Sequence, residues 1–263
     1  MPAGNSKTAS PANPARVYDY LLGGKDHRPS DRAAGKKLMA AKPHLRPNVQ
    51  ANRRFLARAV RFLAREEGIS QFLDIGTGLP TMDNTHEVAQ QVSPSARIVY
   101  VDNDPEVIVH AQALLTSTPE GATDYLQADL ADPGLILAGA ARTLDLSKPT
   151  AIMLLGILYM IPDEAGPYQI VATLADSLAP GGYLAISHPA SDIHPEESAA
   201  GAKVYQRAIG IPQTNRTREQ VTRFFTGLDI VSPGVVPLNH WRPDPDEDTT
   251  AVLSSWAAVG RKQ

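Results

Sequence analysis

The sequence predicts an α/β fold built on a mostly parallel sheet, preceded by a helical segment. Three observations lead to this prediction. From Gln71 onward, short apolar runs that end in Gly, Asp or Asn alternate with stretches of helical spacing. The runs are nearly continuous in apolar residues, which is typical of parallel strands covered by helices on both faces. The residues before Gln71 carry helix-capping signals and lack such runs.

The composition limits the kind of protein. The 263 residues, 43% of them hydrophobic, suffice for one large domain with a small appendage. A formal charge of -3 gives no cationic field, so we expect neither nucleic acid nor a membrane as partner. Cysteine is absent, which excludes disulfides, thiolate metal sites and cysteine nucleophiles. Because we find no apolar signal core or membrane-length run, we expect a soluble cytoplasmic protein.

The N-terminal part of the chain is predicted to be helical after a short lead-in. Residues 1–12 are rich in Pro, Ser, Ala and Asn, and we expect them to be disordered. Asn13 can cap a first helix with Pro14 at its first position, and the Gly23–Gly24 pair would end that helix. Ser30 can cap a second, short helix.

A longer helix follows, marked by apolar residues at helical spacing over 49–63 and closed by Gly68. Residues 13–68 are therefore expected to form a helical extension or cap, and residues 69–263 the sheet domain.

Five strands are expected between residues 71 and 188. They are QFLDI (71–75), RIVYVD (97–102), TDYLQAD (123–129), TAIMLLGIL (150–158) and GYLAISH (182–188). Beyond them we expect a helix over 195–209, another begun by Thr217, a weak strand over 227–231, a Pro-rich loop, and a final strand over 250–259.

A glycine turn after the first strand is the strongest local signal for a site. Asp74 runs into Gly76, Thr77 and Gly78, and glycines there let the backbone turn sharply and let a ligand approach it closely. An ordinary tight turn between strand and helix is the alternative. Thr81 stands where the dinucleotide fingerprint GxGxxG has its third glycine, which favours a mononucleotide-like ligand over a pyrophosphate.

Acidic residues follow the next two strands. Asp102 and the adjacent Asn103 end the second strand, where a carboxylate can accept two hydrogen bonds from a ribose diol, while Asp104 is expected to cap the next helix. Asp129 ends the third strand beside Leu130, where the acid could accept from an adenine amine and the leucine could pack on the ring; a loop cap is the alternative. Because the carboxyl ends of parallel strands line one crevice, we expect these residues to form one site.

The fourth and fifth strands end near a second group of polar residues. Tyr159, Asp163, His188, Asp192 and His194 are candidates for the side of the site that receives a second substrate. His188 or Tyr159 could take a proton from an oxygen or nitrogen nucleophile, although a loop histidine can equally be solvated. The two histidines with Asp192 could also suggest a metal, but no other metal pattern is present and we expect none.

The segment VYDYLLGGKDHRPSD is compact and chemically mixed, as functional loops often are. Lys25 could neutralise a ligand carboxylate, and Tyr18 or Tyr20 could face a cation through the ring quadrupole. The alternative is a helix end followed by a solvated run of charges.

Four strings in order, ARVYDYLLGGKDH, QFLDIGTGLPT, IVYVDNDP and AAVGRK, closely resemble the bacterial S-adenosyl methyltransferase family once catalogued as a domain of unknown function. The likeness extends from about Ala15 to Lys262. It implies a Rossmann-like class I methyltransferase fold: a seven-stranded, mostly parallel sheet with an antiparallel last strand, and an N-terminal helical extension over the cofactor, S-adenosylmethionine.

The resemblance also assigns residues to the cofactor. Gly76 and Gly78 would pass beneath its methionine moiety, Asp102 would bind the ribose, and Asp129–Leu130 would flank the adenine. The segment Gly23–Asp26 would close over the methionine end. The cofactor residues expected from pattern and resemblance together are Tyr20, Gly23, Gly24, Lys25, Asp74, Gly76, Thr77, Gly78, Asp102, Asn103, Asp129 and Leu130.

The sequence departs from the family pattern at two positions. His27 stands where relatives have Asn after GGKD, and Tyr159 stands where many have His near the end of the fourth strand. Both positions lie where the chain would contact the cofactor or the acceptor.

The resemblance implies a methyltransferase that uses S-adenosylmethionine and acts on a small-molecule acceptor, since no basic aromatic surface or nucleic-acid module is present. Catalysis would rest on positioning, with proton removal by His188 or Tyr159 for an oxygen or nitrogen acceptor. Two alternatives stay open: a non-catalytic sensor or partner module that binds S-adenosylmethionine, and an NAD-dependent oxidoreductase, against which Thr81 argues. The sequence predicts neither the acceptor nor the oligomeric state.

Overall fold

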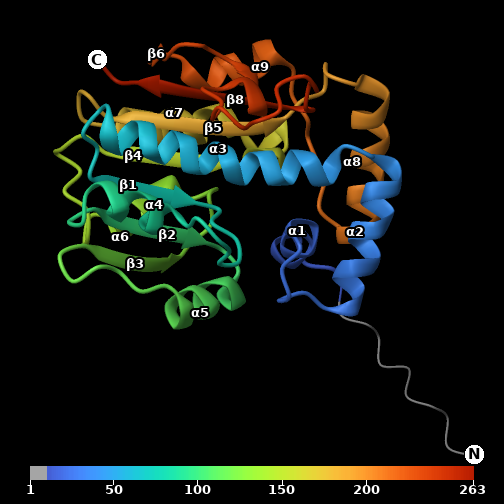
Figure 1. The fold of residues 1–263 in the computed structure, drawn as a ribbon, viewed down its shortest axis with the longest axis horizontal. Helices are drawn as coiled ribbons and strands as arrows, with labels where there is room; N and C mark the ends of the chain where they lie inside the picture. The colour runs from blue at the N-terminus through green and yellow to red at the C-terminus, as the bar shows by residue number, and fades with distance from the viewer. Residues whose placement is uncertain (1–10) are drawn as a thin grey trace, which may run out of the picture.

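A computed structural model describes residues 11–263 as one sheet with helices on both faces (Figure 1). The predicted lead-in, residues 1–12, lies outside the described residues except for its last two. The strands are β1 (Gln71–Ile75), β2 (Arg97–Asp102), β3 (Ala122–Gln127), β4 (Ala151–Leu155), β5 (Tyr183–Pro189), β6 (Asp229–Ile230), β7 (Val236–Pro237) and β8 (Ser255–Arg261).

The helices follow the predicted alternation with the strands. They are α1 (Pro14–Leu22), α2 (Pro29–Ala41), α3 (Leu45–Arg65), α4 (Thr85–Val92), α5 (Pro105–Leu114), α6 (Pro133–Ala140), α7 (Pro167–Asp176), α8 (Pro195–Ile209) and α9 (Arg218–Thr222). Among residues 11–263, no helix is both long and apolar enough to span a membrane.

The sheet order is β3-β2-β1-β4-β5-β8-β6, with β7 paired to β8. The first five strands are parallel and β8 runs antiparallel to β5, which confirms the predicted fold. The sheet has eight strands instead of seven because Val236 and Pro237, expected in a Pro-rich loop, pair with β8.

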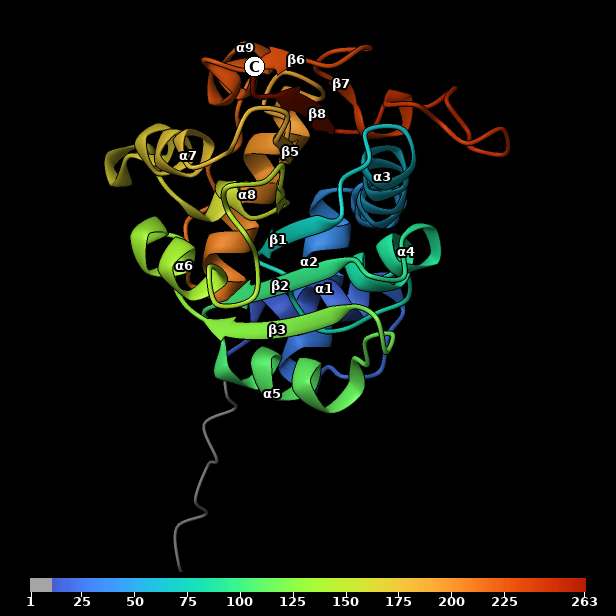
Figure 2. The ribbon, with the colours of Figure 1, turned by 90° about the vertical axis from the view of Figure 1, so that its left-hand side faces the viewer.

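Side chains of alternate strand positions enter two separate cores. Phe72 on β1 packs in one core with residues of α3 and α4, whereas Leu73 and Ile75 enter the other with residues of α6 and α7. Figure 2 shows α3 and α4 on one face of the sheet and α6 and α7 on the opposite face. This double cover explains why the strand runs are almost entirely apolar.

The capping predictions hold for the first helix. Asn13 accepts a hydrogen bond from the Arg16 N–H over 3.2 Å, and Gly23 ends α1 with a left-handed φ of 91°. The second helix begins earlier than Ser30, because Pro29 occupies its first position and Asp31 accepts from the Arg28 N–H over 2.7 Å.

The three N-terminal helices pack against two different parts of the molecule. Helix α3 belongs to the sheet core, where Phe55 and Leu63 are fully buried. Helices α1 and α2 pack instead with α8 around a separate cluster that includes Val17, Leu38 and Tyr205. In Figure 1, α8 lies alongside α2 at the end of the molecule opposite β3 and β6. We call α1, α2 and α8 the helical cap; it stands over the carboxyl ends of the strands.

Candidate active site

A cleft of about 520 Å³ opens at the carboxyl ends of β1, β2, β3 and β4, beside α1 and α3. We call it the main cleft; its volume is typical of a small-molecule site. The predicted ligand-binding residues that line it are Asp74, Gly76, Thr77, Gly78, Asp102, Asn103, Asp129 and Leu130. The structure therefore brings together every sheet-edge residue that the sequence singled out for the cofactor.

The turn after β1 depends on two glycines in the left-handed region. Their φ values are +75° at Gly76 and +65° at Gly78, which L side chains rarely adopt. A Cβ at Gly76 would also lie 2.6 Å from the Ile157 Cγ1 atom. The Gly78 N–H donates to Asp102 Oδ2 over 2.9 Å and ties the turn to the end of β2. At Gly76 and Gly78 the backbone therefore lines the main cleft without a side chain in between.

Asp102 lies half-buried at the end of β2. Its Oδ1 accepts from the Asp104 N–H over 3.0 Å, while its Oδ2 accepts from Gly78. Burial raises the pKa of Asp102, and the backbone N–H donors partly oppose that rise. Each oxygen keeps a lone pair for a further donor, which suits a vicinal diol. Asp104 itself caps α5, as predicted, by accepting from the Glu106 N–H over 2.8 Å.

Asp129 and Leu130 stand side by side after β3. The Asp129 carboxylate accepts from the Ala131 N–H over 2.8 Å and from Asn103 Nδ2 over 3.1 Å. It therefore serves as the loop cap that was the alternative interpretation, while also lining the main cleft. Leu130 is buried and offers an apolar wall beside this polar edge.

Asp74 is buried at the end of β1. Its Oδ2 accepts from Thr85 Oγ1 over 2.6 Å, which joins β1 to the first turn of α4. Burial raises the pKa of Asp74, whereas the Thr85 hydrogen bond and the positive charge of Arg53 act in the opposite direction. The carboxyl group of Asp74 therefore lies close enough to Arg53 on α3 for their charges to interact.

Three residues that the sequence analysis did not assign to the cofactor also line the main cleft: Tyr18 on α1, and Asn52 and Arg53 on α3. Asn52 Nδ2 donates to Tyr18 Oη over 3.0 Å and joins the two helices. Arg53 donates to the Met82 carbonyl oxygen over 2.9 Å, and its buried Nε has no partner among residues 11–263. Asn48 and Asn52, two neutral polar residues four positions apart on one face of an arginine-rich amphipathic helix, were the available signal in the sequence.

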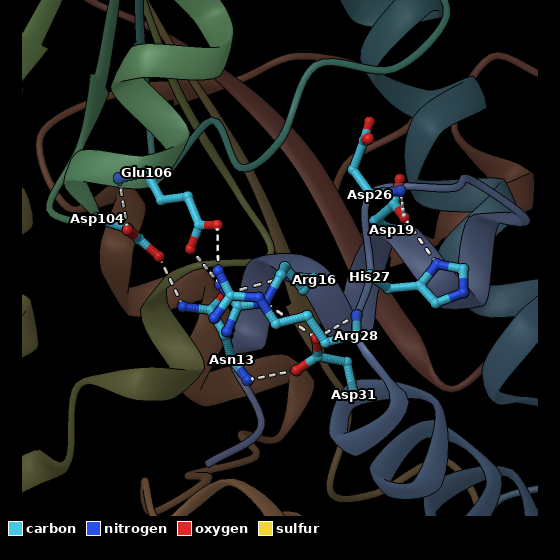
Figure 3. Close-up of polar contacts among 9 residues, drawn as sticks. All are labelled: Asn13, Arg16, Asp19, Asp26, His27, Arg28, Asp31, Asp104 and Glu106. Carbon is cyan, nitrogen blue, oxygen red and sulfur yellow. Dashed lines mark hydrogen bonds and ion pairs between the residues drawn. The ribbon is translucent and has the colours of Figure 1, made fainter. Parts of the chain in front are cut away.

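The GGKD segment differs from its predicted place. Tyr20, Gly23, Gly24 and Lys25 do not line the main cleft, and Lys25 is exposed. The reason is a local tie to buried Asp19, which accepts from the Asp26 N–H over 2.9 Å and lies 3.1 Å from His27 Nδ1 (Figure 3). A Cβ at Gly24 would lie 1.8 Å from Asp19 Oδ1. The double glycine therefore permits this tie, and Tyr18 takes the cleft-lining place expected of Tyr20.

A network of polar side chains connects the helical cap to α5 (Figure 3). Asn13 Nδ2 donates to Asp104 Oδ2 over 2.6 Å. Arg16 and Arg28 both pair with the Glu106 carboxylate, Arg28 at 2.7 Å. We call these five residues the cap latch. Because Asn13 and Asp104 also line the main cleft, the latch closes one edge of it.

A second cavity of about 100 Å³ lies between the helical cap, α3 and β5. We call it the inner cavity. It shares five lining residues with the main cleft: Pro14, Tyr18, Asn52, Gly156 and Tyr159. The two cavities therefore adjoin along these five residues, which we call the common wall.

His188 borders the inner cavity but has no free ring nitrogen. Its Nε2 lies 2.9 Å from Arg216 Nη1 and its Nδ1 lies 3.0 Å from the Pro189 carbonyl oxygen. Since a guanidinium can only donate, Nε2 accepts and the Nδ1–H donates. Burial, with a smaller contribution from the charge of Arg216, lowers the pKa of His188 to about 3, although the Pro189 hydrogen bond and the carboxylate of Asp163 oppose this shift. The imidazole is neutral at pH 7 and cannot take the proton that the sequence analysis assigned to it.

Tyr159 lies on the common wall, as its predicted role near an acceptor requires. Its hydroxyl lies 3.3 Å from the Tyr205 hydroxyl, and burial raises its pKa well above the usual range of a tyrosine. The phenol therefore stays protonated at neutral pH and is a hydrogen-bond donor, not a base.

The other polar residues predicted near the acceptor are engaged elsewhere. Asp163 Oδ1 accepts from Arg216 Nη2 over 2.7 Å, and Asp192 Oδ1 accepts from Trp256 Nε1 over 2.9 Å. His194 lies exposed immediately before α8. Within the part of the chain that the structure describes, no three His, Asp or Glu residues stand close enough to hold a metal ion.

The sheet order, the antiparallel β8 and a cleft across the ends of β1, β2 and β3 define a class I methyltransferase fold. Residues 3–263 match the family model described as S-adenosyl methyltransferase, and the chain belongs to that family. S-adenosylmethionine is the cofactor of this family, as the resemblance implied.

Two solved structures are similar over the whole chain. A DUF574 family protein from Streptomyces avermitilis MA-4680 is 43% identical, with a TM-score of 0.93 over 96% of this chain and 98% of its own. A protein from Thermobifida fusca YX is 42% identical, with a TM-score of 0.87 over 97% of each chain.

A curated relative is more distant. Trans-aconitate 2-methyltransferase from Escherichia coli O9:H4 (strain HS) is 28% identical over 188 residues, which make up 70% of this chain. The chain spans 64% of the length of that relative.

Proposed function

We propose that the protein transfers the methyl group of S-adenosylmethionine to a small-molecule acceptor. The observation that carries this proposal is the common wall of Pro14, Tyr18, Asn52, Gly156 and Tyr159 between the two cavities. The main cleft has the volume and the polar edge that a nucleoside cofactor needs, and the inner cavity offers adjacent space for an acceptor.

The residues of the main cleft fit the cofactor. Asp102 would accept from the ribose hydroxyls, and Asp129 would accept from the adenine amine with Leu130 against the ring. The turn Gly76–Gly78 leaves room beneath the methionine part, and Arg53, with its unpartnered Nε, would pair with the methionine carboxylate. Arg53 thus takes the role that the resemblance suggested for the GGKD segment.

The cofactor, when bound, supplies a methyl group already activated by its sulfonium. The chain must hold the nucleophile of the acceptor in line with the methyl-sulfur bond, and such alignment supplies roughly 7 to 11 kcal/mol of the barrier. Neither His188 nor Tyr159 is a base at neutral pH, for the reasons given above. We therefore infer that methyl transfer depends on positioning and enclosure, without a proton taken by either residue.

Two other functions make different demands on the site. A sensor of S-adenosylmethionine needs the main cleft but has no use for the inner cavity. An NAD-dependent oxidoreductase needs space for a pyrophosphate at the glycine turn, where Thr81 replaces the third glycine. Methyl transfer is the function that uses both cavities.

Calorimetric titration with S-adenosylmethionine, S-adenosylhomocysteine and NAD tests the proposal. We expect both sulfur ligands to bind and NAD not to bind, and Asp102→Ala to weaken the sulfur ligands by about tenfold or more. Asp246→Ala is the control, because Asp246 is exposed and outside both cavities. Binding of NAD alone would exclude the proposal. Trans-aconitate, named for the curated relative, is the first acceptor to assay for methyl transfer.

A further inference from the structure

The inner cavity contains a buried lysine that forms no ion pair among residues 11–263. Lys42 follows α2 directly, lines the cavity and is only 4% exposed. Its aliphatic stem runs over Gly201 of α8, where a Cβ would lie 2.2 Å from the Lys42 Cδ atom. The glycine therefore makes room for this side chain between the two cap helices.

The charge of Lys42 is unpaired within the part of the chain that the structure describes. Every ion pair found among residues 11–263 involves other cations. Burial lowers the pKa of Lys42. The negative charge of Glu197, which does not form an ion pair with Lys42, partly opposes this shift. An ammonium removed from water without a close anion is costly, and a bound anion would offset that cost.

The rest of the inner cavity contains no second charge. Its apolar lining residues are Pro14, Val17, Leu21, Leu38, Leu45, Val49, Pro189 and Leu238. No Asp or Glu contributes to the lining, and His188 is neutral. The lining also includes neutral polar side chains such as Asn48, Gln213 and Ser255. The cavity therefore combines one cation with apolar and neutral polar walls, which matches an organic acid.

We propose that the methyl acceptor is a small carboxylic acid with a second nucleophilic group. Its carboxylate pairs with Lys42 in the inner cavity, and the second group attacks the methyl carbon as the methyl–sulfur bond of S-adenosylmethionine breaks, so that S-adenosylhomocysteine leaves with the bonding electron pair on sulfur. A second carboxylate oxygen fits this step, because it has no proton to be removed. This inference rests on the proposed function. Lys42 is not among the five residues of the common wall, so the acid is anchored away from that wall and the rest of the molecule extends toward the cofactor. Lys42 is thus a residue that selects and orients the acceptor.

The size of the cavity limits the acid. A dry cavity of ~150 Å³ accommodates benzene in a well-studied case, and the inner cavity is smaller, at about 100 Å³. We therefore expect acids of a few carbon atoms to enter it whole, and larger acids to enter only in part.

Calorimetry on the protein saturated with S-adenosylhomocysteine tests this inference. The probes are propionate and butyrate, each compared with its amide, which has nearly the same shape but no charge. We expect the acids to bind about tenfold or more tightly than the amides. Equal binding of acid and amide, or no binding of any acid, would overturn the inference.

Variants of Lys42 assign the effect to this residue. Lys42→Met and Lys42→Gln keep most of the stem and remove the charge, and each should weaken acid binding by about tenfold or more. Lys37→Met removes an exposed charge from α2 and should leave acid binding unchanged. The affinity for S-adenosylhomocysteine should stay at the wild-type value in all three, and the thermal midpoint of the Lys42 variants should not fall below that of the wild type, because a costly buried charge is removed. Acid binding retained in both Lys42 variants would contradict the inference.

The same titrations distinguish failure of the proposed function from failure of the role inferred for Lys42. Failure of the wild-type protein to bind S-adenosylhomocysteine would contradict the proposed function. Normal binding of S-adenosylhomocysteine without selective acid binding would contradict only the role of Lys42.

Discussion

The backbone N–H of Gly78 donates to the Asp102 carboxylate over 2.9 Å. This hydrogen bond joins the turn after β1 to the acid that ends β2, two features of the cofactor site that lie on separate strands. The turn and the acid are therefore held in one geometry, and a change in either is expected to disturb both.

The glycine turn leads to a first prediction. Gly76→Ala places a side chain at φ +75° and 2.6 Å from Ile157, so we expect a loss of about 1 to 3 kcal/mol in the free energy of unfolding. The displaced turn should also weaken S-adenosylhomocysteine binding. Gly181→Ala is the matched control, since Gly181 has φ +81° but lies away from the main cleft. Equal ligand affinity in the two variants, measured by calorimetry, would show that the turn does not contact the cofactor.

Arg53 is expected to recognise the amino-acid part of the cofactor. Arg53→Met should weaken S-adenosylhomocysteine binding by about tenfold or more, because a charge-assisted pair with the carboxylate is lost. Binding of 5′-methylthioadenosine, which lacks that carboxylate, should not change. Arg54→Met, at the neighbouring position and paired with Glu247 at 3.2 Å, should affect neither ligand. Equal weakening of both ligands by Arg53→Met would contradict this assignment.

The cap latch should contribute modestly to cofactor binding. Glu106→Gln removes the ion pairs to Arg16 and Arg28, and we expect S-adenosylhomocysteine affinity to fall by about two- to fivefold at low salt, as for a partly exposed pair. Raising the salt concentration should bring the wild-type affinity toward that of the variant. Glu120→Gln, which changes an exposed acid, is the control. A salt response identical in all three proteins would exclude a role for the latch.

His188 should make folding stability depend on pH. Its pKa falls from 6.5 in the unfolded chain to about 3 in the folded protein, so the unfolded state binds the proton more readily. The stabilisation is complete above pH 6.5 and is lost as the pH falls toward 3. Between pH 7 and pH 5 this group alone should cost about 2 kcal/mol of unfolding free energy.

Urea unfolding of the wild type and of His188→Gln at the two pH values checks that expectation. The variant should lose less stability between pH 7 and pH 5, because Gln does not titrate. An identical loss in both proteins would mean that His188 is not held neutral.

Much of the fold follows from local pattern. The strand runs of β1, β2, β4 and β5 are recognisable because both faces of these strands are covered. The cap at Asn13 is recognisable because its partner lies three residues away. β7 could not be predicted, since it consists of two residues, one of them Pro237, and exists only through its pairing with β8. Short edge pairings of this kind depend on tertiary contact instead of local propensity.

The candidate site, too, could be predicted from the sequence only in part. Asp102 and Asp129 could be placed because topology gathers the ends of parallel strands. The contributions of Tyr18 and Arg53 depend on how α1 and α3 dock, which no local pattern specifies. The neutral state of His188 depends on its burial and, to a smaller extent, on Arg216, which lies on a different segment of the chain. The sequence therefore predicted the strand-end residues that line the main cleft and placed Tyr159 and His188 near a second cavity, but it could not predict the docking of Tyr18 and Arg53 or the neutral state of His188.

A crystal structure of the protein with bound S-adenosylhomocysteine is the most direct test of how the main cleft binds the cofactor. We expect the ribose hydroxyls at hydrogen-bond distance from Asp102, the carboxylate at Arg53, and the sulfur directed toward the common wall at Tyr18 and Tyr159, where the main cleft adjoins the inner cavity. A ligand bound outside the main cleft, or with its sulfur directed away from that wall, would contradict this expectation.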